Sequence, residues 1–251
     1  MPEADSRQPL RIYSNDGEVT TVRSPVRNEI LQLLAREGET SFARILEVTK
    51  LSKSTVSGYL SSLVEAGLVL EVPAPDDARR KNYILHAVFL GDMVPATYSG
   101  ASEFRELIRQ MHTKSDKVDY RDILPHIIKI ALAEAGIQIN PVLRRGGMIL
   151  GEAVASYVVA DTLEKTLANI AEFWERYQFG NMKTASLEPL KIDVYNCYEC
   201  ALMPKEVKSS CIISVGILTA LLSAFYGKEV LVQEVRCISN GDPCCCFAVT
   251  V

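Results

Sequence analysis

The sequence predicts an α+β protein of two domains. Short amphipathic helices and a strand pair fill the N-terminal part of the chain, further helices fill the middle, and strand-like segments gather near the end. Helices and strands that are segregated along the chain in this way are typical of α+β folds. A length of 251 residues suffices for two ordinary domains, and we expect the first over residues 1–90, a linker with a connecting helix over 91–118, and the second over 119–251.

The first domain should open with a hairpin and continue with three helices. The turn Asn15-Asp16-Gly17 lies between two short apolar stretches, which predicts a strand pair. Ser24-Pro25 starts the first helix and Gly38 ends it, and the apolar residues between them repeat at three- and four-residue intervals. We expect the second helix over about 41–50 and the third over 52–67, with a serine cap at its start and a glycine at its end.

A strand pair with a basic tip should follow the third helix. Leu68–Val72 and Asn82–His86 have strand character, and the loop between them ends in Arg79-Arg80-Lys81. Three helices and a basic-tipped hairpin predict a winged helix-turn-helix, whose third helix enters the major groove of double-stranded DNA. The candidate DNA-binding residues on the third helix and the wing are Lys53, Ser54, Thr55, Ser57, Tyr59, Arg79, Arg80 and Lys81.

Charge and symmetry bear on how this module would be used. The net charge of the chain is -4 at pH 7, so affinity for phosphates would depend on a local patch. A winged helix that only binds another protein is the alternative, and the consecutive cations of the wing argue against it. One module reads few base pairs, so we expect a homodimer whose two-fold symmetry places two recognition helices about 34 Å apart.

Four stretches of the first domain resemble a known family. They are Ser24-Pro-Val-Arg-Asn-Glu-Ile-Leu, Leu51-Ser-Lys-Ser-Thr-Val-Ser-Gly-Tyr-Leu, Leu63-Val-Glu-Ala-Gly-Leu-Val and the wing Arg79-Arg-Lys-Asn-Tyr. The segment from Leu10 to Val88 resembles the ArsR-like winged-helix regulators of archaea and bacteria, and Tyr59 stands where many of those proteins have histidine. The resemblance implies a DNA-binding protein that regulates transcription.

The rest of the chain should form a linker, helices and a small antiparallel sheet. Pro95 and Gly100 make the stretch 90–100 irregular. The amphipathic helix Ala101–Lys114 is either a connector or the dimer contact. The helices expected beyond it are Tyr120–Gly136, Arg145–Val159, Leu163–Tyr177 and Glu206–Tyr226, and the expected strands are Ser186–Asn196, Val230–Cys237 and Cys245–Val251. Any small-molecule effector would bind between the helices of 120–177 and the sheet.

One uncharged run approaches the length that spans a bilayer, the stretch from Ser209 to Gly227. Ser, Thr and Gly interrupt it and Lys208 and Lys228 bound it, so we interpret it as a buried helix and expect no membrane partner. The start of the chain has no secretory pattern, so a cytoplasmic protein is expected. In a reducing compartment the seven cysteines favour metal ligation, thiol redox chemistry or core packing over a disulfide framework.

Four residues near the end of the chain are candidate metal ligands. Cys211, Glu234, Cys237 and Cys245 are of the types that zinc accepts, and three thiolates with one carboxylate can fill a tetrahedral shell. Alternatively, the cysteines are small buried side chains, and residue types alone leave both interpretations open. On an ideal strand Glu234 and Cys237 point to opposite faces, so a metal site needs a twist near Ile238, which Asn240-Gly241 could supply.

The spacing of these residues resembles a second known family. Cys211-x15-Gly227-x-Glu229 and then Glu234-x2-Cys237-x3-Gly241-Asp-Pro-x-Cys245-x-Phe247 resemble the 4-vinyl reductase domain, whose wider fold is similar to that of the TRAPP trafficking subunits. The similarity covers about Tyr120 to Val251. In such domains of aromatic-sensing regulators a similar set of residues binds zinc, which implies zinc as a cofactor here with Cys211, Glu234, Cys237 and Cys245 as its ligands.

The remaining cysteines, Cys197, Cys200, Cys244 and Cys246, are redox candidates. Cys197 and Cys200 form a C-x2-C pair, which is a reversible dithiol, a pair of alternative metal ligands, or a strand end with two small residues. Cys244 and Cys246 alternate with Cys245 along a strand, so they should face away from it. A winged helix followed by a 4-vinyl reductase domain with extra cysteines resembles the redox regulators of methanogenic archaea. That resemblance implies a regulator that senses redox state or a small-molecule effector.

Two other functions compete with regulation, an enzyme of the vinyl reductase type and a small-molecule-binding scaffold. We recognise no catalytic base, nucleotide fingerprint or nucleophile elbow, and the histidines His86, His112 and His126 lie in different elements. An N-terminal DNA-binding module favours the regulator over both alternatives. We therefore expect no enzymatic activity.

Overall fold

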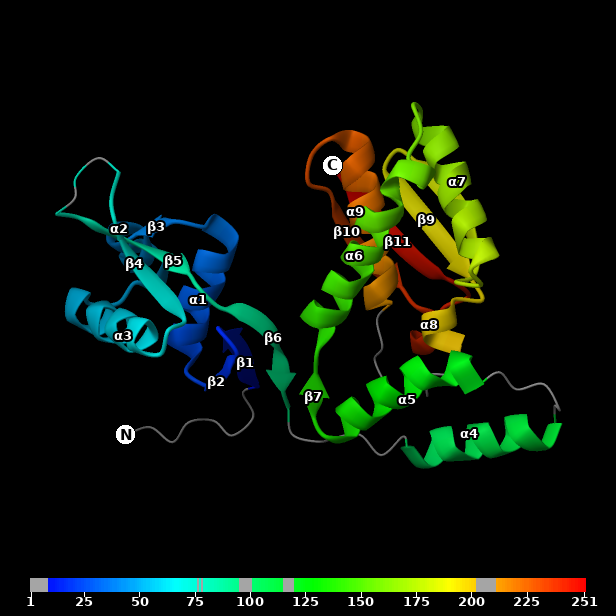
Figure 1. Ribbon diagram of the computed structural model, residues 1–251, viewed down its shortest axis with the longest axis horizontal. Helices are drawn as coiled ribbons and strands as arrows, with labels where there is room; N and C mark the ends of the chain where they lie inside the picture. The colour runs from blue at the N-terminus through cyan, green and yellow to red at the C-terminus, as the bar shows by residue number, and fades with distance from the viewer. Residues whose placement is uncertain (1–8, 76, 78, 95–100, 115–119, 202–210) are drawn as a thin grey trace. The chain divides into compact units, whose positions relative to one another are not determined.

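The computed structural model of the chain describes residues 9–75, 77, 79–94, 101–114, 120–201 and 211–251. The chain divides into two compact units (Figure 1). The N-terminal unit is Met1–Pro95 with Ile137–Ile139, and the C-terminal unit is Ala96–Gly136 with Asn140–Val251. Helix α4, Ala101–Lys114, therefore groups with the C-terminal unit, while the functional boundaries near residues 90 and 118 stay a prediction.

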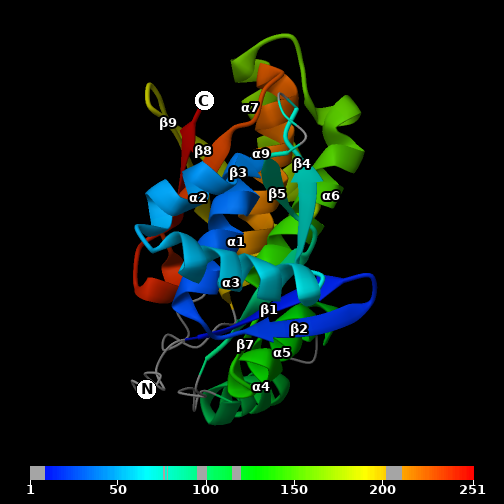
Figure 2. The same ribbon diagram turned by 90° about the vertical axis from the view of Figure 1, so that its left-hand side faces the viewer.

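Three helices form the body of the N-terminal unit, as expected: α1 (Pro25–Glu37), α2 (Phe42–Thr49) and α3 (Lys53–Glu65). Each begins with a serine whose side chain accepts a hydrogen bond from a backbone N–H of the first turn. Their apolar faces meet in one core that includes Ile30, Leu34, Ile45, Leu60 and Leu63. Figure 2 shows these helices with strands β4 and β5 beside them.

Two sheets complete the N-terminal unit within the part of the chain that is described. In one, β5 (Lys81–Leu85) pairs with β4 (Val69–Pro73) and with the short β3 (Thr40–Ser41). The other has the order β2-β1-β6-β7, in which β1 (Leu10–Asn15) pairs with β2 (Glu18–Val22) and with β6 (Val88–Met93), and β6 pairs with β7 (Ile137–Gln138). Both hairpins that the sequence predicted are present.

The expected linker over 90–100 is wrong in its first part. Residues 90–93 belong to β6, and residues 95–100 lie outside the described residues. The strand escapes a pattern search because its pairing with β1 shifts register between Ile12 and Tyr13, which breaks the alternation of apolar side chains. Gly91, with φ +151°, lies beside this irregularity, where the backbone of Gln138 leaves no room for a Cβ.

A four-stranded antiparallel sheet carries the described core of the C-terminal unit, in the order β10-β11-β9-β8. The strands are β8 (Asn181–Leu187), β9 (Leu190–Tyr195), β10 (Leu231–Arg236) and β11 (Cys245–Thr250). The single strand expected over 186–196 is wrong, because Glu188-Pro189 makes a turn that divides it into the β8–β9 hairpin. Together with the helices, this sheet confirms the α+β fold class.

The helices of the C-terminal unit are α4, α5 (Tyr120–Glu134), α6 (Asn140–Val158), α7 (Leu163–Arg176), the single turn α8 (Tyr198–Ala201) and α9 (Ile212–Tyr226), counted over the described residues. Helix α6 begins five residues before the expected Arg145, because Asn140-Pro141 makes its start. The expected start of the last helix at Glu206 lies outside the described residues, and the described helix begins at Ile212.

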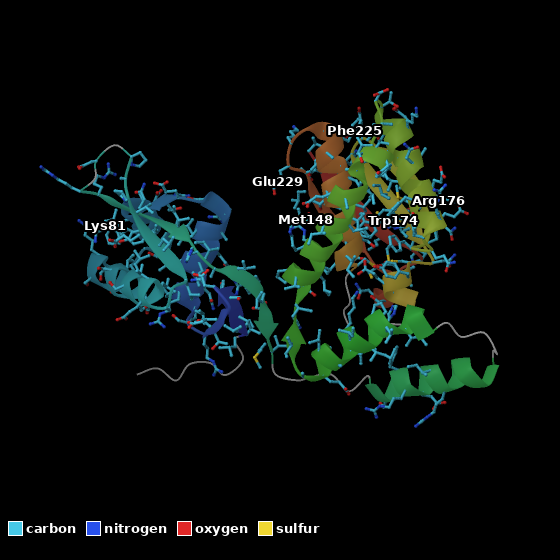
Figure 3. The ribbon with its side chains drawn as sticks, in the orientation of Figure 1. Lys81, Met148, Trp174, Arg176, Phe225 and Glu229 are labelled. Carbon is cyan, nitrogen blue, oxygen red and sulfur yellow. The ribbon has the colours of Figure 1, made fainter. Side chains whose placement is uncertain are left out.

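Helix α9 is apolar on all sides because protein surrounds it. Ser214 to Leu222 are all buried, and Gly216 lies against Gly147 of α6. The core beneath it includes Trp174 of α7, labelled in Figure 3, and Phe247 of β11, both fully buried. Among the described residues, no helix combines the length and the apolar character that a membrane span requires.

Candidate metal centre and nucleic-acid interface

Five cysteine side chains meet at one end of the C-terminal sheet. Cys197 follows β9, Cys200 lies on α8, Cys211 precedes α9, Cys237 follows β10 and Cys245 begins β11. All five are buried, with exposed fractions between 0% and 3%. The sequence separates these residues into a candidate metal set and a redox pair, whereas the structure brings them into a single cluster, which we call the thiol cluster.

Short distances connect the sulfurs of the thiol cluster. The Sγ atom of Cys200 lies 3.1 Å from that of Cys211, 3.2 Å from that of Cys237 and 3.5 Å from that of Cys245. Cys211 and Cys245 are 3.5 Å apart, Cys245 and Cys237 are 3.9 Å apart, and Cys197 lies 3.4 Å from Cys211. Thiolates around one tetrahedral zinc ion lie about 3.8 Å apart, given a Zn–S length of about 2.3 Å. The observed spacing therefore suits one ion with several sulfur ligands.

A local irregularity of β10 brings Glu234 and Cys237 to the same site. The pairing of β10 with β11 shifts register between Glu234 and Arg236, and a 3-10 turn, Ile238–Asn240, follows and ends at Gly241 with φ +96°. The carboxylate of Asp242 accepts a hydrogen bond of 2.8 Å from the backbone N–H of Cys237 and holds this turn. The twist that the sequence requires near Ile238 is thus present as a bulge followed by a tight turn.

The carboxylate of Glu234 lies at the edge of the thiol cluster. Its Oε2 accepts a hydrogen bond of 3.0 Å from the backbone N–H of Cys211, the cap residue of α9. Its Oε1 is buried and has no hydrogen-bond partner among the described residues. Burial raises the pKa of this carboxyl group. Because a buried polar atom ordinarily has a partner, an oxygen of this kind beside several thiols suits a metal ligand, and the donors present fit a metal ion.

The electrostatics of the thiol cluster also favour a cation. Hydrogen bonds from Cys197, Cys211, Cys237 and Cys245 lower the pKa of Cys200, so one thiolate is stabilised by its neighbours. The same contacts raise the pKa of Cys211 and of Cys245, because further negative charge would be crowded and buried. Two four-donor groups lie within 4.8 Å, Cys197, Cys200, Cys211 and Cys245 in one, and Cys211, Glu234, Cys237 and Cys245 in the other. Either group could hold a metal ion.

A buried glutamate that sequence reasoning missed supports the cluster. Glu199, between the two cysteines of the C-x2-C pair, is 1% exposed. Its carboxylate accepts hydrogen bonds from the backbone N–H groups of Ile213 (3.2 Å) and Ser214 (2.7 Å), at the start of α9, and forms an ion pair of 2.9 Å with Lys129 of α5. A charged residue inside a buried C-x2-C pair was the available signal, because such a charge needs partners.

Cys244 and Cys246 lie apart from the thiol cluster, as their alternation with Cys245 predicts. Cys246 pairs in the sheet with Asp193 and Arg236, whose side chains form an ion pair of 3.0 Å. Both thiols are buried, and this burial raises their pKa values. A buried thiol of raised pKa reacts slowly with oxidants, so neither residue has the environment of a reactive cysteine.

The outward face of α3 carries the candidate groove-contacting residues. Lys53, Ser54, Thr55 and Ser57 are exposed. The Oγ of Ser52, which caps the helix, lies 3.0 Å from Ser54 Oγ and 2.7 Å from Thr55 Oγ1, so these hydroxyls already have partners at the start of α3. Tyr59 is half-buried under the Arg27 guanidinium, 5.9 Å from its ring centre, which makes it a support of the helix as well as a candidate contact.

The wing is exposed and basic, and one of its cations has an acidic partner. Lys81, labelled in Figure 3, lies 2.6 Å from the Glu71 carboxylate across the β4–β5 hairpin. That contact raises the pKa of Lys81, which stays charged. The backbone N–H of Arg79 donates to the Asp77 carboxylate, which fixes the turn of the wing. Arg79 and Arg80 also line a hollow of about 330 Å³ beside the start of α2.

A groove lies between α6 and α7, with a volume of about 470 Å³. Tyr157, Phe173 and Tyr177 line it together with Asn169 and the exposed ion pair of Glu172 and Arg176. The aromatic lining continues toward the thiol cluster, because Phe173 contacts Phe179 and Phe179 stacks on Tyr198 of α8 at 5.0 Å between ring centres.

Two family models match the chain at the two candidate sites. Residues 24–70 match the bacterial regulatory protein, arsR family, and residues 190–251 match the 4-vinyl reductase domain. The first segment contains α1 to α3, and the second contains Cys197, Cys200, Cys211, Glu234, Cys237 and Cys245. Both resemblances that the sequence suggested are confirmed. The matches indicate a DNA-binding regulator with a C-terminal 4-vinyl reductase domain.

Curated relatives occur in Methanocaldococcus jannaschii. The uncharacterized protein MJ1642 is 27% identical over 85 residues, which cover 34% of this chain and 53% of the relative. The uncharacterized protein MJ0745 is 29% identical over 87 residues, which cover 35% of this chain and 48% of the relative. The chain therefore spans about half the length of the curated relatives that it matches.

Similar solved structures include sensory domains and transcriptional regulators. The phenol-responsive sensory domain of the transcription activator PoxR is 15% identical with a TM-score of 0.44, covering 61% of this chain and 90% of that one. A vinyl-4-reductase family protein from Methanocaldococcus jannaschii is 18% identical with a TM-score of 0.38, covering 61% and 96%. The regulator Tm0710 from Thermotoga maritima is 20% identical with a TM-score of 0.24, covering 43% and 73%. At these TM-scores the likeness supports no statement about function.

Proposed function

We propose that the chain is a homodimeric transcription regulator that binds double-stranded DNA and adjusts its affinity through the thiol cluster of its 4-vinyl reductase domain. The observation that carries the proposal is the conjunction of an ArsR-type helix-turn-helix and a buried cluster of five cysteines in one chain. The ion is zinc, because thiolates with a carboxylate are ligands it accepts in structural sites. Such a site contributes folding energy and protects its thiolates.

DNA binding rests on α3 and the wing. The exposed side chains Lys53, Thr55 and Ser57 enter the major groove, and the wing cations contact the phosphate backbone. Phosphate contacts carry no base information. Replacement of Arg79, Arg80 and Lys81 by alanine should therefore weaken binding to specific and unrelated duplexes alike and flatten the salt dependence of the affinity. Fragments of the protein's own promoter serve as the specific duplex, and unchanged binding by the triple variant contradicts the assignment.

A homodimer gives this module its specificity, because two-fold symmetry presents two recognition helices to two half-sites. Helix α4 is the candidate contact between the protomers. Sedimentation at micromolar concentration should give a dimer, both with and without DNA. A monomer under both conditions contradicts this part of the proposal.

The sensing step is oxidation of the C-x2-C pair, since Cys197 and Cys200 lie in the thiol cluster and a disulfide between them would change its ligands. Cys197→Ser and Cys200→Ser should each make DNA affinity indifferent to a thiol oxidant. A small-molecule effector in the groove between α6 and α7 is the second candidate signal, favoured by the aromatic contacts that lead from Phe173 to Tyr198. Under that alternative, both serine variants respond to the effector as the parent does.

A further inference from the structure

The thiol cluster holds more donors than one tetrahedral ion can use. Five thiols and the Glu234 carboxylate are available, whereas a closed zinc site takes four ligands. The two four-donor groups overlap, since Cys211 and Cys245 belong to both. Two donors are therefore left over whichever ligands the ion selects, and the structure indicates which positions can be exchanged.

Cys200 can take the place of Glu234 without any change in the other three ligands. Its sulfur lies within 3.5 Å of the sulfurs of Cys211, Cys237 and Cys245, which are the three thiols that share a donor group with Glu234. Cys200 with these three makes a four-sulfur set whose measured spacings run from 3.1 to 3.9 Å. A soft thiophilic ion prefers sulfur over carboxylate oxygen, so the four-sulfur set is favoured while Cys200 is reduced.

Glu234 is positioned to wait beside the ion. One carboxylate oxygen is anchored by the backbone N–H of Cys211 at 3.0 Å, and the other is buried without a hydrogen-bond partner among the described residues. The anchor depends on the start of α9 and not on the metal. The free oxygen thus stays near Cys211 whether or not it binds the ion.

We propose that Cys200 and Glu234 are alternative fourth ligands of a single thiophilic divalent ion held by Cys211, Cys237 and Cys245. This inference rests on the proposed function, in which oxidation of Cys197 and Cys200 is the signal. In the reduced chain Cys200 occupies the fourth position. When Cys197 and Cys200 form a disulfide, the two thiols give up two electrons and two protons to the oxidant, the Cys200 sulfur leaves the ion, and a Glu234 oxygen replaces it.

The exchange lets the domain respond to oxidation without losing its metal. Cys211, Cys237 and Cys245 keep α9, β10 and β11 joined in both states, and the segment that is released is α8, which carries Cys200 and Glu199 (Figure 1). The contacts of α8 with α5, from Lys129 to Glu199 and from His126 to the carbonyl of Tyr198, are then the ones that change.

X-ray absorption on the unmodified, zinc-loaded full chain tests the exchange directly. Sulfur-only coordination is expected under reducing anaerobic conditions. After treatment with a diazene oxidant, which is itself reduced to the hydrazine, three sulfurs and one oxygen are expected with zinc retained. An oxygen ligand in the reduced chain, or unchanged coordination after a Cys197–Cys200 disulfide is verified by mass spectrometry, overturns the proposal. DNA binding does not enter this readout, so its failure is distinguishable from failure of the proposed function.

Cobalt-loaded variants provide the second test, because thiolate-to-cobalt absorption falls when sulfur ligands are lost. In the reduced state Glu234→Gln should keep the parental spectrum, and Cys200→Ser should show the spectrum of the oxidised parent. The double variant should lose about tenfold or more in cobalt affinity relative to either single variant, since one protein ligand is then missing in every state. Cys244→Ser, a buried cysteine outside the cluster, is the matched control and should behave as the parent.

The oxidised state separates the two ligands most sharply. Glu234→Gln should release cobalt on oxidation, whereas the parent should retain it. Loss of cobalt by reduced Glu234→Gln together with a parental spectrum for Cys200→Ser shows that Glu234 is the permanent ligand, which overturns the exchange.

Discussion

Replacement of Glu199 by glutamine should destabilise the C-terminal unit by about 3 kcal/mol or more. The carboxylate is 1% exposed and holds three donors: Lys129 at 2.9 Å and the backbone N–H groups of Ile213 and Ser214. Removal of one partner of a buried ion pair leaves the other charge uncompensated, which typically costs about 3–5 kcal/mol. The Lys129 side chain keeps 12% exposure, which favours the lower end of that range. The charge at the start of α9 adds about 0.5–1 kcal/mol.

Thermal unfolding of the metal-loaded chain measures this effect. For a unit of this size about 3 kcal/mol corresponds to a fall in Tm of roughly 6–12 °C. The double variant Glu199→Gln with Lys129→Met should lose less than the sum of the single variants, because they share one interaction. Glu172→Gln is the matched control, since its ion pair with Arg176 is exposed and should contribute at most about 0.5 kcal/mol. A loss below about 1 kcal/mol for Glu199→Gln, or additive single variants, refutes the reasoning.

Two further predictions concern the wing and the packing of α6 on α9. Glu71→Gln should tighten DNA binding and steepen its salt dependence by about one counterion, because it removes the acidic partner of Lys81; weaker binding in a salt titration contradicts this role. Gly216→Ala should destabilise the C-terminal unit by about 1–3 kcal/mol, since its Cβ would lie 2.9 Å from the backbone nitrogen of Met148. Gly146→Ala meets no atom within 4 Å and should be neutral or stabilising by up to about 1 kcal/mol, so equal effects of the two substitutions in chemical denaturation contradict the packing argument.

The helices of the N-terminal unit could be predicted because their signals are local. Ser24, Ser41 and Ser52 cap α1, α2 and α3 through their own side chains, and apolar spacing marks the buried face of each helix. The β8–β9 hairpin was missed because Glu188-Pro189 interrupts an otherwise continuous strand pattern. Strand β6 was missed because its partner in the sheet, β1, is distant in sequence, and pairing of that kind leaves little trace in the local pattern.

The candidate metal centre was predictable only in part. The spacing of Cys211, Cys237 and Cys245 and the need for a twist after Glu234 could be inferred from the sequence. The approach of Cys200 to these sulfurs could not, because it depends on how α8 packs under the start of α9. Glu199 and Lys129 are 70 residues apart, and nothing local links them.

The most direct test of the central claim is the affinity of the full, metal-loaded chain for a duplex from its own promoter, measured by fluorescence anisotropy before and after oxidation of the C-x2-C pair. The account predicts salt-dependent binding that changes about tenfold or more between the two states, equivalent to about 1.4 kcal/mol. It also predicts that Cys200→Ser removes the difference while DNA binding itself persists. Affinity that is the same in reduced, oxidised and metal-free chains, or no binding to DNA in any of them, would contradict the account.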